Sequence, residues 1–201
     1  MKIVIIVVVV FAVCLGLIGF ARGDGTTISI SPPSSTLPES QIGNSFQVNI
    51  TISNVPNLWF WTVRLNWDPA VLNVTNVEEG PFMQSAGQRL FLNTPPQPTG
   101  YIKEITCSLL SKNSVSGNGI LATVTFNVTA SGQSDITLNE TQLLQPDTGS
   151  GHAQITHTVD NGHVIVVPEF PSWAIPAIIL AATMAAAILT KKQLKPAPQH
   201  D

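Results

Sequence analysis

The sequence predicts an all-β domain, a two-sheet β-sandwich, lying between two apolar segments. Between residues 24 and 167 no window keeps an apolar stripe at helical spacing, whereas apolar and polar residues alternate with a period of two in several short segments. These segments are rich in β-branched residues and are separated by clusters of Gly, Pro and Asn, which is typical of strands joined by turns. Several such strands pack as two sheets, each with one buried and one solvated face.

An apolar segment precedes this domain. Residues 3–20 are almost all apolar behind Lys2, and a small-x-small sequence ending at Gly23 follows. The pattern predicts a secretory signal peptide over residues 1–23, cleaved near Gly23. The run is also long enough to remain as an uncleaved membrane helix, because about 20 apolar residues span the hydrocarbon core of a bilayer.

A second apolar segment, residues 173–190, follows the domain and is itself followed by Lys191 and Lys192. Basic residues beside a spanning segment stay on the cytoplasmic side of the membrane. We therefore expect a transmembrane helix at 173–190, with a basic cytoplasmic tail after it. The domain at residues 24–167 would then lie outside the cell, anchored in the membrane at the cell surface.

Within the domain, alternation assigns the strands in chain order. Ile28 and Ile30 alternate with serines, a Pro-rich lead-in follows, and residues 162–167 form the last strand. Three longer strands each place an apolar set on one face. These sets are Phe46, Val48, Ile50 and Ile52; Trp61, Val63, Leu65 and Trp67; and Ile120, Ala122, Val124, Phe126 and Val128.

Three tryptophans lie within nine residues of one another, Trp59, Trp61 and Trp67. They are separated from Val63 and Leu65 by even numbers of residues, so a strand would place all five side chains on the same face. Five apolar side chains on one face indicate the core. We therefore expect Trp61 and Trp67 to fill the sandwich and Trp59, at the start of the strand, to be only partly covered.

Charge and spacing exclude several classes of function. The domain has ten acidic and four basic residues and no basic stripe, which argues against nucleic-acid binding. Glu78 and Glu79 are adjacent, so a strand would point them to opposite faces, and the five-residue offset of His152 and His157 has the same effect. Cys107 has the parity of buried neighbours and predicts a small core residue. We expect no catalytic residue, no metal site and no cofactor.

Residues 42–80, IGNSFQVNITISNVPNLWFWTVRLNWDPAVLNVTNVEEG, resemble the start of the cohesin family. The shared elements include a turn glycine at Gly43, an Asn-Val-Pro turn at 54–56 and an aromatic-Asp-Pro sequence at 67–69. Residues 117–138 and 160–167 resemble later strands of the same family. The resemblance implies a nine-stranded jelly-roll sandwich without an active site. It also implies a partner, because cohesins of cellulosome systems bind dockerin modules on enzymes, and related folds occur as carbohydrate-binding modules.

The tail resembles the PEF-type C-terminal sorting signals of archaeal surface proteins. The matching residues are Pro168, Glu169, Phe170 and Pro171, followed by the apolar segment and the two lysines. This resemblance implies that a membrane-embedded enzyme cuts the tail and transfers the protein to a lipid. A plain membrane helix is the alternative.

Four acceptor sequons for N-glycosylation predict which faces of the sandwich are covered by sugar: Asn49, Asn73, Asn127 and Asn139. The asparagines of the strands have the parity opposite to the apolar residues and so point outward. The family topology would place Asn49, Asn73 and Asn127 on one sheet, with Asn139 near the edge of the other. A bulky glycan makes a poor docking surface.

The nearly bare face of the second sheet is therefore the predicted partner-binding face. Its outward residues would be Phe60, Thr62, Arg64, Glu104, Thr106 and Ser108. The leading hypothesis is a surface-anchored, non-catalytic module that binds a protein partner, such as a dockerin-bearing enzyme of polysaccharide degradation. A carbohydrate-binding module is the alternative, for which Tyr101, Phe82 and Phe91 are the candidate aromatic residues. A structural or adhesive component of the cell envelope is the third.

Overall fold

The computed structural model describes residues 25–168, together with residues 176, 179–180 and 182–184. The expected signal peptide at 1–23, most of the expected helix at 173–190 and the sorting motif beyond Pro168 lie outside the described residues. None of the helical residues that are described belongs to a helix long and apolar enough to cross a membrane.

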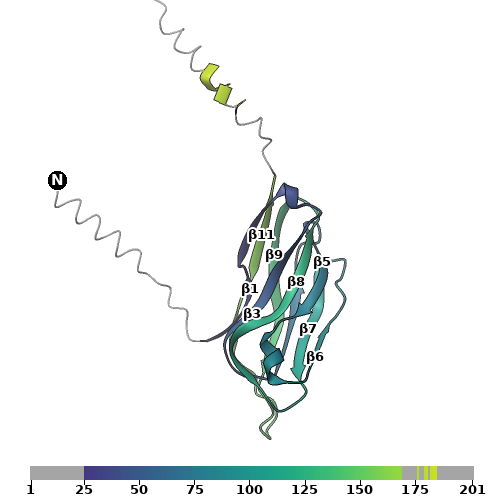
Figure 1. The fold of residues 1–201 in the computed structure, drawn as a ribbon, viewed down its shortest axis with the longest axis vertical. Coiled ribbons are helices and arrows are strands. Elements are labelled where there is room, and N and C mark those ends of the chain that lie inside the picture. The colour runs from purple at the N-terminus through teal and green to yellow at the C-terminus, as the bar shows by residue number, and fades with distance from the viewer. Residues whose placement is uncertain (1–24, 169–175, 177–178, 181, 185–201) are drawn as a thin grey trace, which may run out of the picture.

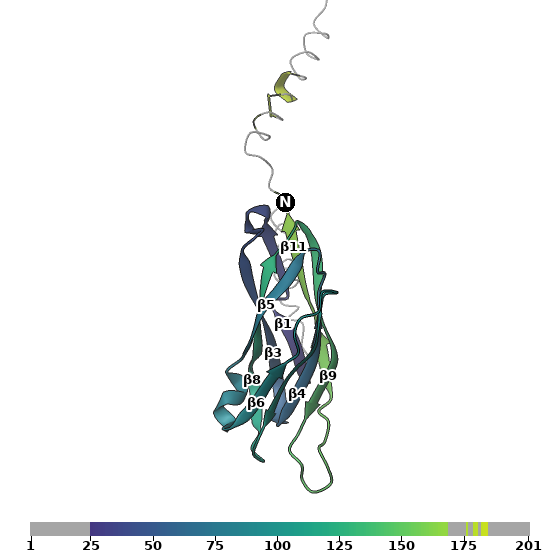
Figure 2. The same cartoon turned by 90° about the vertical axis from the view of Figure 1, so that its right-hand side faces the viewer.

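The domain is an all-β sandwich of two sheets, as expected (Figures 1 and 2). The five-stranded sheet has the order β10-β1-β3-β8-β5, and the six-stranded sheet has the order β2-β11-β9-β4-β7-β6. The strands are β1 (Thr26–Ser31), β2 (Ser34–Pro38), β3 (Ser45–Leu58), β4 (Phe60–Asn66), β5 (Leu72–Glu79), β6 (Arg89–Asn93), β7 (Tyr101–Leu109), β8 (Val115–Val128), β9 (Gly132–Leu144), β10 (His157–Asp160) and β11 (Gly162–Val167). Two short 3-10 helices, η1 (Glu39–Gln41) and η2 (Phe82–Ala86), join them.

The described residues thus form eleven strands, and the expected number of nine is wrong. The difference arises because both terminal strands change sheets partway along. The chain leaves the five-stranded sheet after β1 at Pro32, which has no backbone N–H to donate, and continues as β2 in the other sheet. The expected loop after β1 is therefore partly strand: β2 pairs in parallel with β11, and β1 pairs in parallel with β10.

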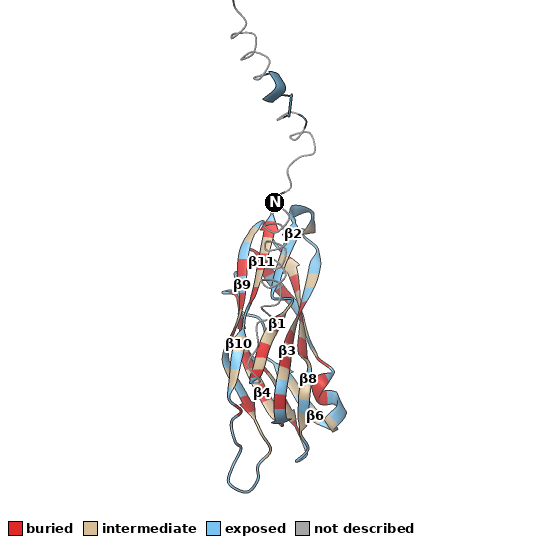
Figure 3. Cartoon of the chain, turned by 90° about the vertical axis from the view of Figure 1, so that its left-hand side faces the viewer, coloured by how far each residue is buried: buried red, intermediate tan, exposed pale blue. Residues whose placement is uncertain are grey.

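The core lies between the two sheets and contains the residues that parity assigns to it. Trp61, Val63 and Leu65 have no exposed surface, and Trp67 is 6% exposed. Figure 3 shows buried and exposed positions along the strands. Trp59 is half-buried, as expected, and stacks on His152 with ring centres 4.2 Å apart. The tryptophans of this stretch are therefore core residues or partly covered, and form no binding platform.

This core is complete within residues 26–167. The first two strands pair with the last two, β1 with β10 and β2 with β11, so both ends of the described domain are held by its own segments. Cys107 is the one cysteine between residues 24 and 167, so no disulfide can form within the domain and the core alone must stabilise it. We conclude that residues 24–167 can fold on their own, as expected of a domain of this size with its own core.

Candidate functional site: the outer face of the six-stranded sheet

The acidic residues that could suggest catalysis are divided between the two sides of β5. Glu78 is exposed and accepts a hydrogen bond from Asn76 at 2.8 Å, whereas Glu79 pairs with Arg89 of β6. This ion pair joins the edge strands of the two sheets. The buried thiol of Cys107 lies 3.9 Å from Glu79 Oε1. These contacts close one side of the sandwich and leave no pair of carboxylates in a cleft.

Burial in this corner makes Cys107 unreactive. Desolvation, and then the charge of Glu79, raise the pKa of the thiol to about 12. The thiolate is the reactive form, so iodoacetamide at about pH 8 should label Cys107 only after unfolding in urea, as read by mass spectrometry. An unfolded thiol has a pKa of about 8.5, below that of the folded protein. The contribution of Cys107 to the free energy of unfolding therefore falls as the pH rises from there toward 12. Rapid labelling of the native protein would contradict this account of Cys107.

The histidines make three separate contacts. His152 stacks on Trp59, His157 is hydrogen-bonded to Thr141, and His163 contacts Asp135. In the part of the chain that the structure describes, no three His, Cys, Asp or Glu side chains gather as a metal site would require.

The predicted binding residues come together on the outer face of the six-stranded sheet. Phe60 of β4 lies opposite Ser108 of β7, and Thr62 lies opposite Thr106 in the next row. These four residues are partly exposed while their neighbours along each strand point into the core. Alternation along a strand produces this arrangement, so the four residues share one outer face of the sheet.

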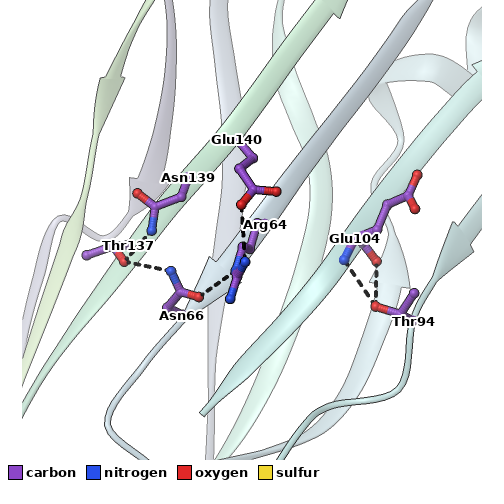
Figure 4. A network of polar contacts seen from close by, with 7 residues as sticks. All are labelled: Arg64, Asn66, Thr94, Glu104, Thr137, Asn139 and Glu140. Atoms are coloured by element: carbon purple, nitrogen blue, oxygen red, sulfur yellow. Dashed lines mark hydrogen bonds and ion pairs between the residues drawn. The ribbon is translucent and has the colours of Figure 1, made fainter. Parts of the chain in front are cut away.

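Arg64 lies on the same face at the centre of a polar network (Figure 4). Its Nη1 donates to Glu140 Oε1 at 3.1 Å and its Nε donates to Asn66 Oδ1 at 3.2 Å. The guanidinium carbon lies 4.5 Å from the centre of the Tyr101 ring. Glu140 has a φ of 47° at an irregularity in the pairing of β9 with β4, and such irregularities turn side chains in new directions. Arg64 is therefore held in place and remains about one-third exposed.

Glu104 is the second charged residue predicted for this face. Its backbone N–H donates to Thr94 Oγ1 at 3.0 Å, and its carbonyl oxygen accepts from the same hydroxyl at 3.4 Å (Figure 4). The carbonyl oxygen also accepts from the Thr94 N–H at 2.9 Å. A register shift between β4 and β7 leaves Lys103 and Glu104 both exposed. No ion pair engages the Glu104 carboxylate within the described residues, so this charge is available to a partner.

Two leucines of β6 extend the face and were not predicted. Leu90 lies opposite Ser108 and Leu92 opposite Thr106, and the two side chains are 49% and 52% exposed. A shallow hollow of about 250 Å³ lies beside them, lined by Leu92, Asn93, Thr94, Glu104 and Thr106. In the sequence Arg-Leu-Phe-Leu-Asn both faces of the strand carry apolar residues, so alternation alone does not tell which side is exposed.

Three of the four sequons lie on the opposite face of the molecule. Asn49, Asn73 and Asn127 are on β3, β5 and β8 of the five-stranded sheet. Asn73 is exposed and lies opposite Asn127, whose amide nitrogen donates to the carbonyl oxygens of Gly43 and Asn44 at 3.1 and 3.0 Å. Of this pair, Asn73 is the more accessible acceptor.

Asn139 lies near an edge of its sheet, as expected, because β11 pairs with β9 only as far as Ile136. It is an exposed residue of β9 and lies opposite Arg64 of β4. Its Nδ2 donates to Thr137 Oγ1 at 3.4 Å within the network of Figure 4. A glycan at this position would stand on the candidate face itself.

The aromatic residues considered for sugar stacking do not form an exposed strip. Phe82 is 9% exposed, and Phe91 packs against the core near Trp61. Tyr101 is on the outer face, but the Arg64 guanidinium covers its ring. Because sugar-binding platforms need several open aromatic faces, these three residues do not build one.

Comparison with known proteins supports the same architecture. A cohesin domain model matches residues 35–166. A search of curated proteins finds no match. Among solved structures, a non-cellulosomal cohesin from the hyperthermophilic archaeon Archaeoglobus fulgidus is similar, with 24% identity and a TM-score of 0.57, covering 71% of this chain and 91% of its own.

Two bacterial structures are similar in the same way. The seventh ScaB type I cohesin of Pseudobacteroides cellulosolvens is 21% identical, with a TM-score of 0.57 and coverage of 74% of this chain and 96% of its own. The third ScaC cohesin of Acetivibrio cellulolyticus, solved with the ScaB dockerin, is 20% identical, with a TM-score of 0.55 and coverage of 71% and 99%. The fold and the family model agree over most of the described domain, and this chain belongs to the cohesin family.

Proposed function

We propose that this protein is a non-catalytic docking module, held at the cell surface, that binds a dockerin-like protein module on the outer face of β9, β4, β7 and β6. The observation that carries the proposal is the composition of that face. One part is apolar and is formed by Leu90, Leu92 and the partly exposed Phe60. The other part is polar and is formed by the network around Arg64 and by Glu104 beside Thr94. Exposed apolar patches rimmed by polar residues are typical of protein–protein interaction sites.

The class of partner is inferred from relatives. The ScaC cohesin of Acetivibrio cellulolyticus is described in complex with a dockerin, and the similar structures include another cohesin in complex with a Cel5 dockerin. By analogy, the partner proposed here is a dockerin-like module carried by an enzyme of polysaccharide degradation. The apolar patch would bury leucine and aromatic surface, and the exposed charges would set the orientation of the partner.

The sugar acceptors support the choice of face. The five-stranded sheet carries three sequons and the six-stranded sheet one, so glycosylation would cover the first more completely than the second. The proposed anchor is the C-terminal tail, which follows β11 directly.

The charged residues of the face provide a first test. Residues 24–167 would be used to capture proteins from the native secretome, with dockerin-bearing proteins identified by mass spectrometry. Arg64→Ala and Glu104→Ala should each weaken capture by about 5- to 30-fold, the range of 1 to 2 kcal/mol for charged contacts at the rim of an interface.

Charge removal away from this face supplies the control. Lys112→Ala and Glu39→Ala change exposed charges outside the face, and both variants should capture the partner as the unmodified domain does. Unchanged capture by both Arg64→Ala and Glu104→Ala would contradict this use of the face.

A further inference from the structure

β6 is an open edge of the six-stranded sheet. The N–H of Thr94 donates to Glu104 of β7 and the N–H of Leu110 donates to Gln88, at 2.9 Å each. In an antiparallel ladder the residues that bond to the neighbouring strand alternate. The even-numbered residues of β6 therefore bond to β7, while the backbone N–H and C=O groups of Arg89, Phe91 and Asn93 point away from it, toward no other strand of the described domain.

The other three sheet edges carry features that prevent pairing. β2 is preceded by Pro33 and ends at Pro38, and β10 is four residues long and ends at Asp160. β5 has a register irregularity between Val74 and Asn76 and ends in two glutamates. Proline, charge, short length and bulges are the devices by which sheet edges avoid pairing.

β6 has the fewest of these devices. Between Arg89 and Asn93 it contains no proline, no lysine and no register irregularity. Its one charged residue, Arg89, is paired with Glu79 of β5, so it does not present an unpaired charge that would oppose strand pairing at this edge. The strand is short, but its free backbone groups and its exposed leucines lie next to each other.

The three central residues of β6, Leu-Phe-Leu, read the same in both directions. Leu90 and Leu92 stand on either side of Phe91, on the outer face of the sheet. We propose that β6 pairs antiparallel with β6 of a second copy of this chain, with Phe91 opposite Phe91 and Leu90 opposite Leu92. The pairing joins two six-stranded sheets into one, satisfies the free backbone groups of both edges and places four leucines side by side. Such self-complementarity is what a twofold-symmetric interface requires.

The twofold symmetry of this dimer determines the relative orientation of the two domains. Opposed residues in a sheet point to the same side, so the twofold axis is perpendicular to the sheet and both candidate docking faces look in the same direction. The long axes of the domains run in opposite directions. β6 lies in the half of the domain away from the end of β11 (Figure 1), so the C-terminal ends of the two copies are far apart.

Because the C-terminal ends lie far apart, this geometry suits two domains that are anchored on two surfaces facing each other. If each copy is held by its C-terminal tail, a step that rests on the proposed function, the two copies overlap at their distal halves. A five-residue strand pair buries less area than a standard interface, so a single pair would be weak. Many copies on one surface would strengthen the contact through multivalency.

A proline at Asn93 tests the pairing. Asn93→Pro removes an N–H that the β6–β7 ladder does not use, and proline is tolerated at such edge positions. Asn93→Ala removes the same side chain and keeps the N–H. Residues 24–167, coupled to beads through the C-terminal end, should make beads aggregate with the unmodified domain and with Asn93→Ala, and Asn93→Pro should abolish aggregation.

The thermal unfolding temperature of each variant shows whether it is folded. Aggregation by folded Asn93→Pro, or no aggregation by the unmodified domain, would overturn the proposal. A variant that loses partner capture at the docking face should still aggregate beads, so this result is separate from the test of the proposed function.

Cysteine cross-linking tests the register without relying on proline. Leu90→Cys and Leu92→Cys domains, mixed in equal amounts and oxidised, should form the mixed disulfide far beyond the 1:2:1 ratio of random pairing, because only the mixed pair lies directly opposite. The native Cys107 is buried and does not interfere. A 1:2:1 ratio of the three disulfides, or less of the mixed one, measured by mass spectrometry, would rule out the proposed register, and absence of disulfides would rule out the pairing.

Discussion

Thr62→Arg should abolish capture of the protein partner. Thr62 is one of the two inner residues of the row formed by Leu92, Thr106, Thr62 and Gln142, near the centre of the docking face. Within the described residues its side chain makes no hydrogen bond to another part of the domain, so the substitution should be tolerated by the fold and act at the surface. A long charged side chain there would separate the surfaces and bury a charge without a partner. We expect a loss of at least about 30-fold in affinity, the size of a single central hot spot.

The opposite face provides the matched control. Thr125 of β8 is a partly exposed threonine on the outer side of the five-stranded sheet. Thr125→Arg makes the same chemical change, on the face that carries Asn49, Asn73 and Asn127. Partner capture measured by surface plasmon resonance should be unchanged for Thr125→Arg. Equal loss for the two variants would mean that docking does not use the six-stranded sheet selectively.

Trp61→Ala should cost about 3–5 kcal/mol of unfolding free energy, the usual range for truncating a buried aromatic residue. Trp61 has no exposed surface, and its cross-strand neighbours Cys107 and Leu143 are also fully buried. The cavity left by the indole therefore cannot fill with solvent or collapse easily. Domains of this kind have only about 5–15 kcal/mol of stability in total. Urea unfolding followed by far-ultraviolet circular dichroism measures the loss.

Trp59→Ala separates burial from residue type. Trp59 is half-buried, donates from Nε1 to the carbonyl oxygen of Ser111 at 2.9 Å and stacks on His152. Its removal deletes this hydrogen bond and one ring contact without opening the core, so the loss should be clearly smaller than that of Trp61→Ala. Equal losses would contradict the assignment of Trp61 to the core and Trp59 to its margin.

The placement of the predicted binding residues depended on two kinds of information. Parity put Phe60, Thr62, Thr106 and Ser108 on one outer face, because a strand turns successive side chains to opposite sides whatever it packs against. Parity did not show that Arg64 would pair with Glu140. That contact needs β9 to lie beside β4 and a residue with positive φ at the irregularity between them.

β2 and β6 show the same limit at the level of whole strands. β2 is a short polar segment next to two prolines. It forms a strand because it pairs with β11, which lies at the other end of the domain in the sequence. In β6 the alternation is apolar on both faces, so the side that holds Phe91 became the inner one when it packed near Trp61. Strand pairing and packing between segments far apart in the chain determine that β2 is a strand and that Phe91 points inward. The local sequence pattern does not contain this information.

The sequence by itself determined the β class, the two-sheet sandwich, the inward tryptophans and the cohesin resemblance, because strand periodicity and turn residues are local properties of the chain. Only the tertiary structure decided that the described residues form eleven strands, that Asn139 lies beside Arg64, that Leu90 and Leu92 are exposed and that β6 is the least protected edge. Each of these depends on which strands become neighbours. That choice is made by hydrogen bonding and burial between segments far apart in the chain.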